Sequence, residues 1–429
     1  MLLYHVMKGL IMEDILSLES NVRSYCRNFP VIFKSAKGSY LYDTDGKVYI
    51  DFLCGAGSLN YGHNNPHIKQ KIIEYLNSDG IVHSLDLATT SKEEFLETFN
   101  SVILQPRKLN YKIQFTGPTG TNAVEAALKI ARKVTGRRGV ISFTNAFHGV
   151  SLGSLAVTGN SYYKEGSRGS LSNVTFMPYD GYFGDTVNTI DYLRCFIEDK
   201  GSGVDLPAAV IVETIQGEGG INVASNVWLH SLYELCKQNN ILLIIDDIQV
   251  GCGRTGTFFS FEESHIIPDL VVLSKSLSGF GLPFSILLLK PDIDLWKPGE
   301  HNGTFRGNNL AFVSSTETLK QFWSTKKFEE EINEKEKILK SELHRIIKTH
   351  LSTNSEIRVK GLIAGVDCTK SELAKMITAQ SFKNGLILER CGSEDQVIKF
   401  LPPLIAPFDV LHKALRIFEE SIATVLLHE

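Results

Sequence analysis

The sequence predicts an α/β fold, in which a sheet of mostly parallel strands is covered by helices on both faces. Between residues 65 and 330, stretches with helical periodicity alternate with short runs of aliphatic and β-branched residues, at 208–215, 241–246, 269–275 and 284–290. Strands that are apolar on both faces and separated by helices are typical of a parallel or mixed sheet. At 429 residues, of which 43% are hydrophobic, the chain is long enough for a second, smaller domain.

The flanking regions predict two further parts. Alternating apolar stretches on either side of the Asp45-Gly46 pair predict a β-hairpin over residues 39–53. A charged helical pattern after residue 330 is followed by strand candidates around 357–366 and 385–400 and by a closing helix near 408–427. We therefore expect an N-terminal segment that packs with the small domain (1–64), a large domain (65–330) and a small α+β C-terminal domain (331–429).

The composition favours small-molecule chemistry. The net charge is -4 and there is no long Lys/Arg block, so the sequence gives no electrostatic basis for a nucleic acid or membrane partner. The seven cysteines are scattered and form no C-x-x-C pair, which is typical of reduced thiols. The N-terminus lacks a signal peptide pattern and no run reaches the ~18 apolar residues of a membrane span. We expect a cytoplasmic protein, with Met12 as an alternative start.

A loop rich in glycine and threonine precedes a predicted helix. It reads "GPTGTN" from Gly117 to Asn122, and apolar residues with helical spacing follow it. The free N–H groups and positive end of such a helix form a ready anion site, although a threonine that only caps the helix would give the same pattern. The G-x-x-x-x-G-K-[ST] spacing of a nucleotide P-loop occurs nowhere in the chain.

Two charged residues end apolar strand patterns: Lys275 ends "LVVLSK" and Asp246 ends "ILLIID". A buried lysine has a lowered pKa and becomes a nucleophile that can form a Schiff base, whereas a lysine that reaches solvent from a strand end has no such role. Because ligands of α/β sheets gather at the carboxyl ends of strands, an anion loop, a carboxylate and a nucleophilic lysine there predict a site for pyridoxal phosphate. The competing interpretation is a Mg²⁺-dependent nucleotide-binding protein built on Asp246 and Asp247, which the missing P-loop disfavours.

Four blocks of the sequence resemble the motifs of the class III aminotransferases, in the same order: "VETIQGEGG", "DDIQVGCGRTG", "LSKSLSGFGLP" and "HNGTFRGNN". The resemblance extends from about residue 21 to the end of the chain. It implies fold type I with a mixed, mostly parallel seven-stranded sheet, pyridoxal 5'-phosphate as cofactor, and a homodimer, or a larger oligomer, with active sites at the interface.

Within this class, "GAGSLNYGHNNP" and "GIVHSLDLATTSKEEFL" resemble the subgroup that exchanges an amino group between L-2,4-diaminobutyrate and 2-oxoglutarate. The alternative is another class III enzyme that uses ornithine, 4-aminobutyrate or a polyamine as amino donor. Synthesis of a compatible solute such as ectoine, of a siderophore and of a peptide antibiotic are three routes in which diaminobutyrate would serve.

The resemblance also implies roles for single residues. Lys275 is expected to hold the cofactor covalently, and Asp246 to contact its pyridine nitrogen. The other expected cofactor contacts are Gly120, Thr121 and Asn122 at the phosphate, Phe147, His148, Glu213, Ile248 and Gln249 around the ring, and Thr304 at the phosphate of the neighbouring subunit. No metal is expected, because no second ligand stands at a metal spacing from His63, His148 or His301.

The sequence departs from relatives such as ornithine aminotransferase at two positions where those enzymes carry an arginine. Lys399 and Val150 occupy these positions here. Lysine offers a point charge in place of the bidentate fork of arginine, so the contacts to 2-oxoglutarate are expected to be built differently. We expect Glu218 and Lys399 to contact the substrate and to pair with each other while the diamine is bound.

Overall fold

The computed structural model describes residues 17–167, 169, 171–184, 186–351 and 354–427. Residues 1–16, and with them the alternative start at Met12, lie outside the described residues. A seven-stranded sheet forms the centre of the large domain, in the order β4-β12-β11-β10-β7-β5-β6. Its strands are β4 (Lys112–Phe115), β5 (Val140–Phe143), β6 (Val174–Met177), β7 (Ala209–Val212), β10 (Leu242–Asp246), β11 (Leu270–Leu273) and β12 (Ile286–Leu289).

The direction of the strands confirms the predicted mostly parallel sheet. β10 pairs in parallel with β7 and β11, and β5 pairs in parallel with β6 and β7. β12 is antiparallel to both of its neighbours, β11 and β4. All four strands predicted from apolar runs are therefore present, and the carboxyl ends of β5, β7, β10 and β11 lie at one edge of the sheet.

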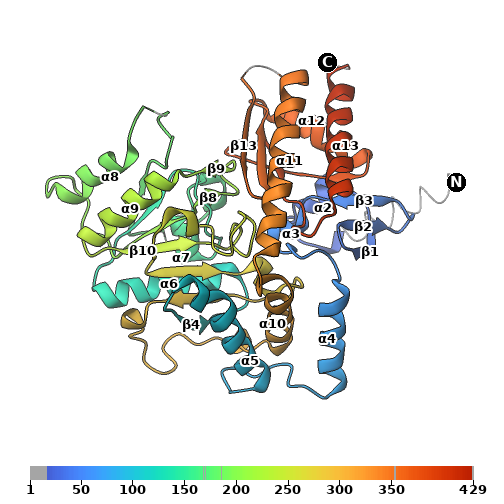
Figure 1. The fold of residues 1–429 in the computed structure, drawn as a ribbon. Helices are drawn as coiled ribbons and strands as arrows, with labels where there is room; N and C mark the ends of the chain where they lie inside the picture. The colour runs from blue at the N-terminus through green and yellow to red at the C-terminus, as the bar shows by residue number, and fades with distance from the viewer. Residues whose placement is uncertain (1–16, 168, 170, 185, 352–353, 428–429) are drawn as a thin grey trace.

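Helices cover both faces of this sheet, as Figure 1 shows. Leu243 and Ile245 of β10 pack in one apolar cluster with residues of helix α9, whereas Ile244 packs in a second cluster with residues of helix α6. Successive side chains of a strand point to opposite faces, so this alternation places α9 and α6 on opposite sides. The helices of the large domain are α4 (Pro66–Asn77), α5 (Thr90–Thr98), α6 (Gly120–Thr135), α7 (Leu152–Val157), α8 (Thr189–Glu198), α9 (Asn226–Gln238) and α10 (Asn309–Trp323).

The predicted N-terminal hairpin is present and belongs to a sheet that also contains a C-terminal strand. Strands β1 (Phe33–Lys37), β2 (Tyr40–Asp43) and β3 (Val48–Asp51) are antiparallel, and β3 pairs in parallel with β15 (Leu386–Ile387). The short helical segments α2 (Tyr25–Asn28) and α3 (Cys54–Gly57) flank this sheet in the chain. The N-terminal segment thus pairs directly with the C-terminal part of the chain.

The described C-terminal part contains an antiparallel sheet and three helices. The sheet has the order β13-β14-β17-β16, with β13 (Glu356–Lys360), β14 (Ile363–Asp367), β16 (Glu389–Cys391) and β17 (Val397–Phe400). The helices are α11 (Lys327–His350), α12 (Ser371–Lys383) and α13 (Phe408–Leu426). A two-stranded sheet of β8 (Ile215–Gln216) and β9 (Asn222–Val223) completes the strands. The charged helix and the closing helix lie where the sequence pattern predicts them.

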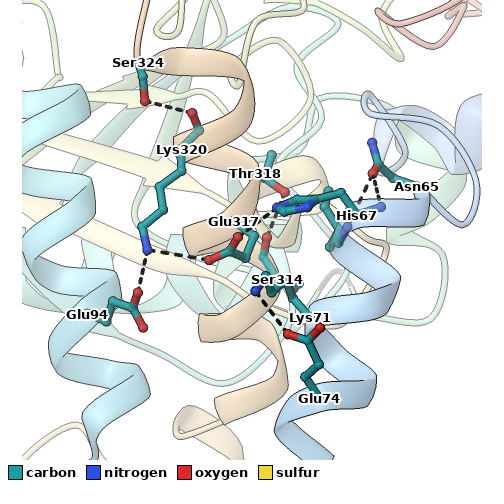
Figure 2. Close-up of polar contacts among 11 residues, drawn as sticks. Asn65, His67, Lys71, Glu74, Glu94, Ser314, Glu317, Thr318, Lys320 and Ser324 are labelled. Atoms are coloured by element: carbon teal, nitrogen blue, oxygen red, sulfur yellow. Dashed lines mark hydrogen bonds and ion pairs between the residues drawn. The ribbon is translucent and has the colours of Figure 1, made fainter.

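A polar network links helix α10 to its two neighbours, as seen in Figure 2. Lys320 of α10 forms ion pairs with Glu94 of α5 and with Glu317 one turn earlier. Glu317 lies 2.9 Å from the ring of His67 of α4. The side chain of Lys320 is 45% exposed, so these pairs orient the helices more than they stabilise them.

Candidate active site

A cavity of about 170 Å³ opens at the carboxyl ends of the parallel strands. Segments that follow β5, β7, β10 and β11 surround it together with the start of α6. Its lining residues are Gly120, Thr121, Phe147, His148, Gly149, Glu213, Ile215, Glu218, Asp246, Ile248, Gln249, Val250 and Lys275. The tertiary structure therefore brings Lys275, Asp246 and the glycine–threonine loop to one place.

Asp246 ends β10 and is held by His148. Its side chain is 4% exposed, and its Oδ2 atom lies 2.7 Å from Nδ1 of the fully buried His148 ring. Burial opposes the charged form of His148, but the hydrogen bond and the negative charge of Asp246 outweigh this effect and raise the pKa of the ring. The raised pKa favours a proton on the ring nitrogen that faces Asp246, and this hydrogen bond orients the Asp246 carboxylate.

Lys275 follows β11 with a backbone φ of 48°, in the left-handed region that non-glycine residues seldom adopt. It lines the cavity, and burial lowers the pKa of its ammonium group. The neighbouring Ser276 hydroxyl donates to the carbonyl of Gly57 at 2.7 Å, and Ser274 donates to the carbonyl of Phe284 at 2.9 Å. These anchors fix the turn that directs Lys275 into the cavity, and a lowered pKa makes its amine available as a nucleophile and base.

The start of α6 packs closely on the segment that follows Asp246. A Cβ atom at Gly120 would lie 2.8 Å from Cδ1 of Ile248, so a larger residue there would require the Ile248 side chain to shift. Thr121 lines the cavity, and its hydroxyl is 2.5 Å from that of Ser151. Asn122 instead accepts hydrogen bonds at its side-chain oxygen from the backbone N–H and the hydroxyl of Thr119 and closes a capping box. The side chain of Asn122 thus caps the helix, and its role at a phosphate stays a prediction.

Phe147, Glu213 and Gln249 complete the walls. The N–H of Phe147 donates to Oε2 of Glu213 at 3.0 Å. Burial raises the pKa of Glu213 to about 7. Gln249 donates from Nε2 to the carbonyl of Ala56 at 3.1 Å, and its buried Oε1 atom has no hydrogen-bond partner among the described residues.

These features fit pyridoxal phosphate on structural grounds. The cavity combines a helix start shaped by Gly120, an aromatic and an aliphatic wall, and a buried carboxylate. An unpartnered amide of Gln249 and an amine with lowered pKa at Lys275 add the polar groups that a polar ring with a carbonyl substituent requires.

Lys399 lies next to the cavity in a cluster of carboxylates. Its Nζ atom is 2.7 Å from Oε1 of Glu218 and 3.0 Å from Oε2 of Glu389. The hydroxyl of Tyr25 donates to Oε1 of Glu389 at 2.8 Å. Glu218 and Lys399 thus form an ion pair that Tyr25 and Glu389 extend, and the expected pairing while the diamine is bound stays a prediction.

Other residues singled out in the sequence lie elsewhere. Asp247 is fully buried and accepts from the hydroxyl and the N–H of Ser260, so it anchors a loop behind the site. Thr304 is exposed and does not line this cavity, and its expected contact with a neighbouring subunit stays a prediction. His63 pairs with Asp51 at 2.7 Å. Among the described residues no group of three or more His, Cys, Asp or Glu side chains could hold a metal ion.

The sequence analysis missed Tyr25 and Glu389. Glu389 had a detectable signal, because it is a charged residue that follows the apolar run Leu386 to Leu388, the same pattern that singles out Lys275. Tyr25 had none, since only the contact with Glu389, 364 positions away in the chain, gives it a role.

All seven cysteines are free thiols. No helix in the described part of the chain is long and apolar enough to cross a membrane.

Comparison with known proteins agrees with this geometry. The sequence model of the family described as aminotransferase class-III matches residues 22–422. A protein of Bordetella parapertussis named diaminobutyrate--2-oxoglutarate transaminase is 54% identical over 413 residues, which are 96% of this chain and 95% of that protein. A protein of the same name from Wolinella succinogenes is 55% identical over 409 residues, with 95% of each chain covered.

Solved structures share the fold at low sequence identity. A Bacillus anthracis aminotransferase superposes with a TM-score of 0.87 at 21% identity and covers 98% of this chain and 99% of its own. The ornithine aminotransferase of Toxoplasma gondii superposes with a TM-score of 0.83 at 24% identity and covers 97% of this chain and 96% of its own. The predicted fold type I architecture is therefore confirmed.

Proposed function

The chain belongs to the class III aminotransferases, and on this premise we propose that it transfers the 4-amino group of L-2,4-diaminobutyrate to 2-oxoglutarate. The products are L-aspartate 4-semialdehyde and L-glutamate, and the reaction is reversible. The convergence of Lys275 and Asp246 on one cavity carries the proposal, because no other described feature supplies both a nucleophilic amine and a buried carboxylate. Identity of 54–55% to relatives named for this reaction supports the choice of substrates.

Pyridoxal phosphate, when bound, supplies an electron sink for the carbanion that forms when the substrate loses a proton. Lys275 would hold the cofactor covalently, and its amine would accept the proton that leaves substrate C4, because burial lowers the pKa of this group. Asp246, oriented by His148, would face the ring nitrogen of the cofactor, where its carboxylate would favour the protonated form of that nitrogen.

The remaining residues bind and orient the cofactor. Gly120, Thr121 and Asn122 belong to the helix start that would hold the phosphate. Phe147 and Ile248 would enclose the ring, Glu213 would support it, and Gln249 would bond its hydroxyl group. Thr304 would reach the phosphate of a second subunit, which makes the protein a homodimer.

Two side chains would sort the two substrates. Glu218 pairs with Lys399 in the present arrangement, which suits a donor whose reacting end carries no carboxylate. When glutamate or 2-oxoglutarate enters, the carboxylate next to its reacting carbon would take the place of Glu218 at Lys399. Since lysine makes a single-point contact, the remaining grip on the substrate must come from other groups. The exposed Val150 offers none.

The setting of the enzyme belongs to the same proposal. We place it in the cytoplasm, where its cysteines remain reduced. Its diaminobutyrate would feed the synthesis of ectoine, a siderophore or a peptide antibiotic.

The test is an absorbance spectrum of the purified holoenzyme before and after each amino donor is added. Diaminobutyrate and glutamate should each convert the cofactor to its amino form, and 2-oxoglutarate should restore the starting spectrum. Ornithine, 4-aminobutyrate and putrescine serve as comparison donors. A higher kcat/KM for one of these three would identify that compound as the amino donor in place of diaminobutyrate. The absence of a spectral response to every amine would contradict aminotransferase activity.

A further inference from the structure

One buried ammonium group faces two carboxylates beside the cavity. Lys399 is fully buried, and the side chains of its partners Glu218 and Glu389 are 23% and 9% exposed. The proposed exchange of Glu218 for a substrate carboxylate requires only one of these partners. Glu389 is therefore a second negative group that the exchange leaves unexplained, and a buried carboxylate is costly unless it serves a cation.

The two carboxylates differ in whether they have an oxygen that is free to bind a ligand in the cavity. Oε1 of Glu218 accepts from Lys399 at 2.7 Å and from Nε2 of Gln249 at 3.0 Å, whereas its Oε2 accepts no hydrogen bond among the described residues. Glu218 lines the cavity, so this second oxygen is available to a ligand there. Glu389 does not line the cavity, and Tyr25 donates to its Oε1 atom. Glu218 is the group that touches a ligand, and Glu389 acts through Lys399.

The charge of Lys399 affects the pKa of Glu218 more than that of Glu389. Burial opposes ionisation of Glu218, but the charges of Lys399 and Lys275 outweigh it and lower the pKa of Glu218 to about 2. Burial raises the pKa of Glu389, and Lys399 offsets this only in part. Two carboxylates thus share the single ammonium group of Lys399, so the cluster is negative when both are ionised. Lys275 would be committed to the cofactor in the holoenzyme, so an ammonium group of a ligand at the cavity face of Glu218 would balance this charge.

We propose that Glu218 and Glu389 form a subsite for the second, non-reacting ammonium group of a diamino donor. Oε2 of Glu218 would receive the ammonium, and Glu389 would share Lys399 so that Glu218 keeps enough negative charge to hold it. Glu389 is thereby a specificity-determining positioning residue. The inference rests on the proposed function and explains how a diamine is preferred to a monoamine.

Comparison of diaminobutyrate with 4-aminobutyrate and glutamate isolates the proposed contact between Glu218 and the second ammonium group. 4-Aminobutyrate has the reacting amine and the carboxylate of diaminobutyrate but lacks the ammonium group on C2. Glutamate brings a carboxylate to Lys399, and the negative charge of Glu389 works against that carboxylate. Removal of the Glu389 charge should therefore lower kcat/KM for diaminobutyrate and leave kcat/KM for 4-aminobutyrate nearly unchanged. The value for glutamate should stay the same or rise.

The experiment measures single-turnover half-reactions of the wild-type holoenzyme and of Glu389→Gln with these three donors. The ratio of kcat/KM for diaminobutyrate to that for 4-aminobutyrate should fall about tenfold, as expected for loss of one charge-assisted contact. Glu389→Asp, which keeps the charge, should retain most of the ratio. Calorimetric dissociation constants for diaminobutyrate and 4-aminobutyrate, measured on Lys275→Ala with and without Glu389→Gln, should show the same change in ratio without turnover.

The outcomes separate the alternatives. An unchanged ratio overturns the subsite, and so does an equal loss with all three donors, which would make Glu389 a structural anchor for Lys399. A wild-type enzyme that does not use diaminobutyrate at all contradicts the proposed function itself, and this is seen before any variant is compared.

Discussion

Nδ1 of His148 lies 2.7 Å from Oδ2 of Asp246, and both side chains are withdrawn from solvent at 0% and 4% exposure. The pairing joins the segment after β5 to the end of β10. The raised pKa of the His148 ring favours a positive charge beside this buried carboxylate, which offsets part of the cost of burying it.

His148→Gln should keep a hydrogen bond to Asp246 but remove the charge. We expect kcat to fall about tenfold to a hundredfold, by analogy with loss of the group that orients a metal ligand. The pH profile of kcat and the absorbance maximum of the bound cofactor should both shift, because a smaller fraction of the cofactor would be protonated at its pyridine nitrogen. A fall in kcat with an unchanged profile and spectrum would assign His148 to packing alone.

Lys275→Ala should abolish covalent attachment and turnover together. Turnover is expected to fall at least about 100-fold, the lower limit for loss of a proton-transferring group. Mass spectrometry after borohydride reduction measures the attachment, and a stopped-flow half-reaction measures the turnover. Lys290→Ala is the matched control, since Lys290 also follows a central strand but pairs with Asp269 at 2.8 Å. An active Lys275→Ala enzyme would overturn the assignment of the site.

Glu218→Ala should change the two half-reactions unequally. The variant leaves Lys399 without its pocket-facing partner, so the half-reaction with diaminobutyrate should slow while glutamate meets less competition for Lys399. Pre-steady-state rates with each donor give the comparison. Proportional changes in the rates of both half-reactions would contradict the proposed exchange of Glu218 for a substrate carboxylate at Lys399.

Asp247→Asn should flatten the dependence of stability on pH. Burial raises the pKa of Asp247 from 3.8 to about 7, so the folded protein binds a proton that the unfolded chain has already released. Stability from this group is present below pH 4 and is lost as pH rises towards 7. At about 1.4 kcal/mol per pKa unit, the shift sets an upper limit of about 4 kcal/mol.

Thermal unfolding of wild type and Asp247→Asn between pH 5 and pH 8 measures this effect. Asparagine keeps the acceptor for Ser260, so the variant should gain on the wild type as the pH rises. Parallel curves for the two proteins across this range would mean that Asp247 stays ionised when the protein is folded.

Arg254→Lys should destabilise the protein. The guanidinium is fully buried and donates to the carbonyls of Leu362 at 2.8 Å and Pro402 at 2.6 Å and to Oδ1 of Asn60. Lysine cannot reach all three acceptors, and a buried acceptor without a donor costs about 1–3 kcal/mol. Chemical denaturation measures the loss. Arg345→Lys is the control, because its pair with Glu419 is exposed and should matter little. Equal stability of both variants would contradict the role of Arg254.

The sequence by itself determined the parts of the protein that depend on local pattern. The apolar runs predicted the strands β7, β10, β11 and β12, because a short continuous apolar run indicates a strand that is buried on both faces. Lys275 and Asp246 could be singled out for the same reason, since a charged residue at the end of an apolar strand is visible without any partner. These two residues and the anion loop predicted a pyridoxal phosphate site, and the resemblance to one family implied the same cofactor.

Tertiary structure alone decided how the polar side chains are used. Asn122 and Asp247 looked alike as polar residues near the site, yet one caps a helix and the other holds a loop. His148, Tyr25 and Glu389 acquire their roles from partners 98, 364 and 10 positions away. Hydrogen bonds and ion pairs require distances of about 3 Å, and such distances between segments remote in sequence exist only once the sheet and its helices are packed.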